Sequence, residues 1–94
     1  MTAGRRRITS GGPWESVAGY SRAVVVGDAC WVAGTTDAGP DGVSQHPGDV
    51  AGQARAVLAI IERALGEGGF TLRDVVRTRM FVTDMSMSGE LSTV

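Results

Sequence analysis

The sequence predicts a small α+β domain, in which a β-hairpin and an amphipathic helix precede a further strand. Two short β-rich runs, Ser21 to Val26 and Ala29 to Gly34, are separated by Gly27-Asp28, and a glycine at the first central position suits a type II′ turn. Apolar residues then recur at helical spacing from 50 to 65, and residues 75–83 alternate with a period of two. A helix between strands acts as a crossover, so we expect a mixed sheet with its last strand near 75–83.

The two hairpin strands are apolar on both faces. Val24 and Val26 alternate with Val25, while Trp31 stands between Cys30 and Val32 in the second strand. One face is expected to pack against the helix. The other face of the hairpin needs residues that pack against it, and this chain hardly supplies them. Another subunit is the natural candidate.

The helix has recognisable ends. Asp49 is a candidate N-cap, and Gly68-Gly69 supplies a residue able to turn left-handed at the other end. Its apolar face contains Val50, Ala54, Val57, Leu58, Ile61 and Leu65. Because strands flank it directly, we interpret this face as core facing the sheet rather than as a membrane or partner surface.

The last predicted strand carries two kinds of face. One side presents Val76, Thr78, Met80 and Val82, and the other presents Arg77, Arg79, Phe81 and Thr83. This period-two alternation is typical of a β-strand whose two faces lie in different environments.

Three other segments are less informative. The arginines at 5–7 form a basic arm, but with three charges and no interleaved aromatics a solvated or edge-strand terminus is favoured over nucleic-acid contact. Residues 13–20 are turn-rich. Residues 35–48 read as a loop with a very short strand around Val43, and His46 within it receives no role, because no other ligand type stands at ligand spacing.

Composition excludes several classes of function. The 94 residues suffice for one small domain, and a net charge of −1 gives no reason to expect a nucleic-acid or membrane partner. A single cysteine, Cys30, excludes an internal disulfide or a paired-cysteine metal site, and we leave open whether it is reactive or buried. The longest apolar run, Ala56 to Ile61, is far below the roughly 20 residues of a membrane span, so we expect a soluble cytoplasmic protein.

Taken in order, these motifs resemble the Rid (RidA, or YjgF) family of enamine and imine deaminases. The resemblance covers roughly residues 5 to 84 and rests on the hairpin, the helix and the last strand in this order and spacing. The matching segments are Gly19-Tyr20-Ser21-Arg22-Ala23-Val24, Val26-Gly27-Asp28, Val32-Ala33-Gly34-Thr35-Thr36, Gln53-Ala54-Arg55 with Leu58, Ile61 and Glu62, and Asp74 to Asp84.

The resemblance implies a chorismate-mutase-like α+β fold, three subunits around a central β-barrel, and ligand sites in the clefts between subunits. It implies hydrolysis of reactive 2-imino acids, such as 2-iminobutanoate and 2-iminopropanoate, to a 2-keto acid and ammonia without a metal or an organic cofactor. Tyr20 falls on the family's early pocket tyrosine, and Gly34 on the glycine that closes the second hairpin strand. Ala33 stands where many members carry a serine.

The resemblance ends after Asp84. In the family a second helix and two closing strands follow, bringing an arginine that binds the substrate carboxylate and a glutamate. Residues 85–94 contain neither motif, so those roles are carried to no residue and the catalytic residues stay unknown. We therefore expect an incomplete Rid-like domain over 1–84 and a non-matching tail over 85–94, for which a shortened reading frame, a frameshift or a degenerate copy are alternatives.

Arg79 or Arg77 is a candidate replacement for that arginine, because a guanidinium exposed to a subunit cleft binds a carboxylate well. The alternative is that both arginines pair across an interface or face solvent. The functional hypotheses are a Rid-like deaminase, whose own activity is doubtful without that segment, and, as alternatives, a non-catalytic small-ligand or interaction module with the same trimeric cleft or a shortened remnant.

Overall fold

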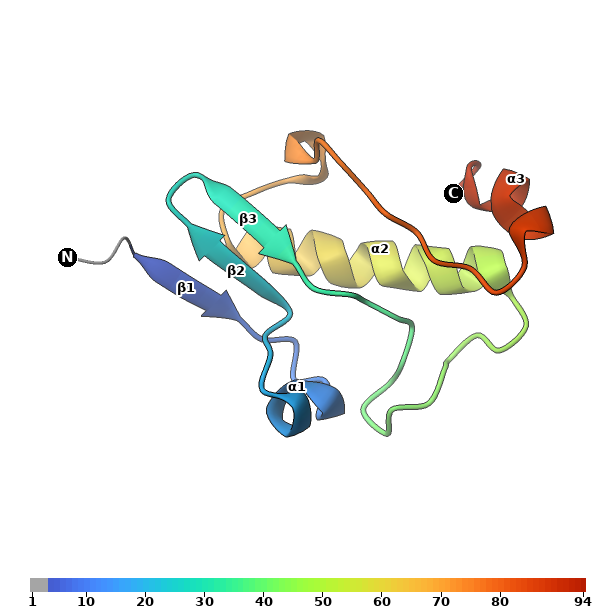
Figure 1. Ribbon diagram of the computed structural model, residues 1–94, viewed down its shortest axis with the longest axis horizontal. Helices are drawn as coiled ribbons and strands as arrows, with labels where there is room; N and C mark the ends of the chain where they lie inside the picture. The colour runs from blue at the N-terminus through green and yellow to red at the C-terminus, as the bar shows by residue number, and fades with distance from the viewer. Residues whose placement is uncertain (1–3) are drawn as a thin grey trace.

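The computed structural model describes residues 4–94, which form a small antiparallel sheet packed against one long helix (Figure 1). The fold is α+β, as predicted. Along the chain the elements are β1 (Arg5–Ile8), α1 (Pro13–Ala18), β2 (Ala23–Val26), β3 (Ala29–Val32), α2 (Val50–Glu67), a 3₁₀ turn (Leu72–Asp74), a second 3₁₀ turn (Met85–Met87) and α3 (Ser88–Leu91).

The sheet has the order β1-β2-β3, and both pairings are antiparallel. The predicted hairpin is confirmed: Val26 lies opposite Ala29, and Gly27 has φ +61° while Asp28 keeps a negative φ, as a type II′ turn requires. The arginines at 5–7 lie on β1, so the edge-strand interpretation of the terminus is confirmed. The expected mixed sheet is wrong, because among residues 4–94 no parallel strand joins these three.

Helix α2 has the predicted ends. The Asp49 carboxylate accepts a hydrogen bond from the Gly52 backbone N–H at 3.0 Å, and Gly68 follows the last turn. Gly68 is needed for close packing, because a Cβ there would lie 2.9 Å from Val25 Cγ2 and 3.0 Å from Ile8 Cδ1. The Arg6 guanidinium donates to the Gly68 carbonyl at 3.0 Å, which fastens the helix end to the edge strand.

The core lies between the sheet and the C-terminal half of α2. Its buried members are Ile8, Ala23, Val25 and Ala64, with Cys30, Val32 and Phe70 packed against them. The N-terminal half of α2 extends beyond the sheet toward the end of the molecule that carries α3 (Figure 1). Leu58, on the predicted apolar face of the helix, is accordingly 39% exposed. Within residues 4–94, no helix combines the length and the apolar character needed to cross a membrane.

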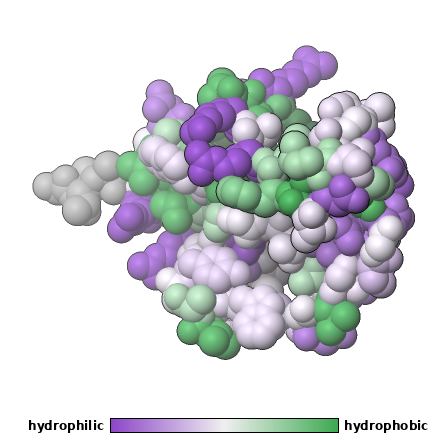
Figure 2. Space-filling model, turned by 45° about the vertical axis from the view of Figure 1, so that its right-hand side comes forward, coloured by the Kyte–Doolittle hydropathy of each residue, from purple (hydrophilic) through white to green (hydrophobic). Residues whose placement is uncertain are grey.

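The predicted strand at 75–83 is wrong. Residues 75–82 form no regular element, and in the described chain no backbone ladder joins them to a neighbour. A strand exists only where an adjacent strand takes up its N–H and C=O groups, and alternating side chains cannot supply that partner. The segment is strongly exposed: Val76 is 99% and Phe81 86% accessible, and hydrophobic groups show among hydrophilic ones on the molecular surface (Figure 2).

Two short features of the structure differ from the prediction. The turn-rich passage contains α1, which begins after Gly12 and ends at Gly19 with φ +74°. The short strand expected around Val43 is an isolated bridge between Ala38 and Ser44. Glu15 is the only residue of helix α1 that is buried.

Candidate functional site

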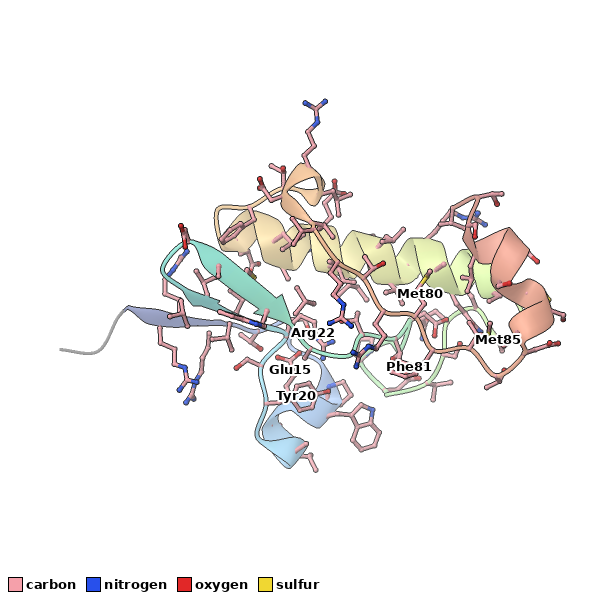
Figure 3. The ribbon with its side chains drawn as sticks, turned by 45° about the horizontal axis from the view of Figure 1, so that its top comes forward. Glu15, Tyr20, Arg22, Met80, Phe81 and Met85 are labelled. Carbon is pink, nitrogen blue, oxygen red and sulfur yellow. The ribbon has the colours of Figure 1, made fainter. Side chains whose placement is uncertain are left out.

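Arg22 organises a polar cluster where the hairpin opens beside α1 (Figure 3). Its side chain is 6% exposed although it carries a full charge. Nη1 donates to the Gly34 carbonyl at 2.6 Å and to Thr35 Oγ1 at 2.6 Å, and the Thr35 hydroxyl donates in turn to the Ala33 carbonyl at 2.9 Å. These charge-assisted bonds hold the chain leaving β3 against the residue that enters β2.

Glu15 lies on the other side of Arg22. Its Oε2 is 3.8 Å from Arg22 Nε, which is too long for a hydrogen bond, so the pair interacts mainly through charge. Burial alone would raise the pKa of this carboxyl, but hydrogen bonds from the Ser10 and Thr9 side chains and from the Ser10 and Gly12 backbone N–H groups outweigh burial. The net effect lowers the pKa of Glu15 below its ordinary value of 4.5 and keeps it ionised beside Arg22.

Two predicted site residues meet in this cluster. The Arg22 guanidinium carbon lies 5.4 Å from the centre of the Tyr20 ring, within cation–π range, and the same guanidinium holds the Gly34 carbonyl. Tyr20 is 37% exposed, and within residues 4–94 its hydroxyl has no hydrogen-bond partner. In this corner of the molecule, one guanidinium therefore contacts both the Tyr20 ring and the Gly34 carbonyl.

Arg79, the third predicted site residue, is not brought into this corner. It lies in the extended segment at 75–82, is exposed, and within the described residues forms no ion pair or side-chain hydrogen bond. The neighbouring Met80 and Phe81 lie beside the other half of α2, away from Glu15 and Tyr20 (Figure 3). Arg77 is likewise exposed.

A second buried carboxylate shapes the loop that contains His46. Asp37 accepts hydrogen bonds from Ser44 Oγ at 2.7 Å and from the His46 backbone N–H at 2.8 Å. Burial raises the pKa of Asp37, but these donors and the nearby His46 charge outweigh it, so the pKa is lowered. Only the backbone of His46 makes this contact, and the histidine ring itself is assigned no chemical role.

Neither a metal centre nor an activated thiol is built into the described residues. No three His, Cys, Asp or Glu side chains among residues 4–94 are grouped as a metal would require. Cys30 is half-buried, and burial raises the pKa of its thiol, which disfavours the reactive thiolate.

Sequence reasoning did not single out Glu15 or Arg22 as a pair. Glu15 was assigned to a turn, and Arg22 was quoted only as part of a matching segment. One signal was available: a charged residue directly before an apolar strand is buried only when it has partners, and the nearest upstream carboxylate is Glu15, seven positions away. Which partners it finds depends on the path of α1, which the turn residues do not specify.

Comparison with known proteins decides the family. The sequence profile of the family described as endoribonuclease L-PSP matches residues 12–94. The chain belongs to this family, also called Rid or YjgF. A Rid-family relative from Sulfurisphaera tokodaii, a RutC family protein, is 33% identical over 80 residues, covering 85% of this chain and 64% of its own. The Streptomyces coelicolor protein SCO2049 is 39% identical over 75 residues, covering 80% of this chain and 55% of its own. The chain thus spans between half and two thirds of the length of these relatives.

Solved structures share the fold. Rv2704 from Mycobacterium tuberculosis, described as a member of the YjgF/YER057c/UK114 family, is 47% identical with a TM-score of 0.83, and the match covers 96% of this chain and 70% of Rv2704. Yeast Mmf1, at 22% identity and a TM-score of 0.81, is similar in fold. These structures confirm the predicted chorismate-mutase-like architecture of the part that this chain contains.

Proposed function

We propose that this protein acts on small 2-imino acids, converting the imine and water to a 2-keto acid and ammonia. The observation that carries the proposal is that the Arg22 guanidinium both donates to the Gly34 carbonyl and lies over the Tyr20 ring. Tyr20 and Gly34 are fourteen positions apart and are the residues that the resemblance to the Rid family assigns to the pocket, so their shared contact with Arg22 supports the proposal.

Each group at the corner has a role in this reaction. The Tyr20 hydroxyl positions the water that attacks the C=N carbon, and such positioning alone accounts for a large part of catalysis. The Gly34 carbonyl has a second lone pair, which accepts the N–H of the imine while Arg22 occupies the first. The Arg79 guanidinium, which lacks a partner within residues 4–94, binds the substrate carboxylate across a subunit interface.

The assembly in this proposal is a homotrimer whose subunits cover the outer face of the sheet. Val24 and Trp31 are directly opposed in β2 and β3, so they share one face, and Trp31 is 61% exposed. An exposed tryptophan on an apolar sheet face is typical of an interface. Mass measurement in solution tests this part, and a clean monomer would count against it.

An RNA substrate is a weaker match to these observations. The name of the family, endoribonuclease L-PSP, suggests RNA cleavage, but this chain has a net charge of −1, and one of its three adjacent arginines, Arg6, is already bound to the Gly68 carbonyl. Single-stranded RNA should therefore stay intact under conditions in which imines are consumed.

The test is release of ammonia from 2-iminopropanoate generated enzymatically in the assay. We expect Tyr20→Phe to lower the rate by roughly a hundredfold and Arg79→Ala to raise KM, while Arg73→Ala, which removes another exposed arginine, leaves both unchanged. No ammonia release by the unaltered protein would refute the proposed reaction. Pyruvate binding without turnover would instead indicate a non-catalytic binding module.

A further inference from the structure

A cleft of about 160 Å³ opens on the side of Arg22 that faces α2. Its walls come from residues 8–12 after β1, residues 38–40, Arg22, and the helix residues Ile60, Arg63, Ala64 and Glu67. Neither Tyr20 nor Gly34 lines it, so it is separate from the corner described above. Its volume is below the roughly 300 Å³ of pockets for drug-sized ligands, and suits a molecule of a few non-hydrogen atoms.

Arg22 supplies a hydrogen-bond donor that is free to meet a ligand there. Nη1 is used by Gly34 and Thr35, and Nε faces Glu15, whereas Nη2 has no partner within residues 4–94. Every fully buried side-chain nitrogen or oxygen in that part of the chain has a partner. Nη2 must therefore reach open space, and the cleft is a space that Arg22 lines. Arg22 is 6% exposed, so a nearly buried cation lines this small cleft and keeps one donor without a partner among the described residues.

Two other charges select the ligand. Arg63 lines the cleft from α2 and forms no ion pair within the described residues, so a second cation is available. Glu67, one helical turn further on, lines the same cleft, and its carboxylate repels a second negative charge on a ligand. Ile60 and Ala38 provide apolar wall between these groups.

We propose that this cleft is a binding site for a small monocarboxylate, with the ligand carboxylate between Arg22 Nη2 and Arg63 and its short carbon chain against Ile60. Two guanidinium groups match the planar geometry of a carboxylate. The site does not depend on the proposed imine chemistry, because it uses the opposite side of Arg22.

The experiment titrates the full chain with propanoate and follows amide and arginine side-chain NMR signals. We expect saturable shifts in residues 8–12 and around Ile60, with weaker binding of malonate and inorganic phosphate. Arg63→Gln should weaken propanoate binding roughly tenfold, the loss of one charge-assisted contact. Arg55→Gln, an exposed arginine on the same helix outside the cleft, is the matched control and should change nothing.

A second variant distinguishes loss of the binding site from loss of folding. Ala38→Ile fills the cleft from its loop side and should abolish propanoate binding while circular dichroism stays unchanged. Arg79→Ala removes the cation proposed for the imine substrate and lies outside the cleft, so it should leave propanoate binding in the cleft intact, and failure of the imine reaction and failure of this site are separable. The proposal is overturned if propanoate does not saturate at millimolar concentration, or if Arg63→Gln and Arg55→Gln behave alike.

Discussion

The hairpin and the segment at 75–82 have similar sequences and opposite structures. Both are rich in Val, yet β2 buries Ala23 and Val25 between two neighbouring strands, while Val76 is 99% exposed. The difference is not in β propensity. β2 has a partner on each side close along the chain, whereas the segment at 75–82 has none among residues 4–94.

The comparison teaches that alternation predicts which side chains would share a face and says nothing about whether an adjacent strand exists. The outer edge of β3 is unpaired in the described chain. No backbone hydrogen bond joins residues 75–82 to that edge, so their N–H and C=O groups must form hydrogen bonds with solvent.

Hydrogen exchange should separate the two regions most strongly. Ladder amides of β2 open only when the sheet unfolds, whereas amides at 76–82 have no backbone acceptor. We expect rates that differ by roughly a thousandfold or more, measured by deuterium incorporation. Comparable protection in both segments would mean that residues 75–82 are paired in solution.

Core truncation should cost the most stability. Ile8 is 6% exposed and contacts the buried cluster, so Ile8→Ala removes packed volume and leaves a cavity. The free energy of unfolding should fall by about 2–4 kcal/mol, measured by urea denaturation. A loss below this range would place the core elsewhere.

As the pH falls, protonation of Glu15 should be the first event that lowers the stability of the fold. Its pKa is lowered in the folded state, so its contribution to stability is complete above its ordinary value of 4.5 and disappears as pH falls through the lowered pKa. Thermal unfolding between pH 7 and 3 should show a decline that Glu15→Gln makes shallower. Asp84 also has a lowered pKa, through its bonds with Ser86, but these are local to the exposed segment. Asp84→Asn should therefore change the pH profile less than Glu15→Gln does.

The hairpin turn should tolerate no side chain at its first position. Gly27 has φ +61°, where an L-residue is strained, and Gly27→Ala should destabilise the fold by about 1–2 kcal/mol. Gly89 has ordinary backbone angles and open space around it, so Gly89→Ala serves as the control. Equal melting temperatures for the two variants would contradict the observed turn.

The smallest effect should come from the exposed segment. Phe81 is 86% exposed, so Phe81→Ser should change the free energy of unfolding by less than about 0.5 kcal/mol. Urea denaturation at low protein concentration gives the comparison with Ile8→Ala. A loss as large as that of Ile8→Ala would show that the segment is packed in solution.

Local chemistry carried much of the prediction. Gly27-Asp28 specified the hairpin, Asp49 and Gly68 bounded the helix, and both depend on neighbours within a few residues, which explains why they were predicted correctly. Helix α1 was missed because six residues between glycines give too short a periodic signal. The roles of Tyr20 and Gly34 stay predictions; both residues contact Arg22, which is paired with Glu15, and a linear pattern does not connect these four residues.

By itself the sequence determined the family, the α+β class, the hairpin with its turn, and the length of the long helix. These depend on local backbone preference and on the spacing of apolar residues, which can be read along the chain. Only the tertiary structure decided that the sheet is antiparallel with three strands, that residues 75–82 lack a strand partner within residues 4–94, and that one buried guanidinium contacts both Tyr20 and Gly34. Each of these depends on which segments meet in space, and a strand or a buried charge is stable only with the partner that such a meeting provides.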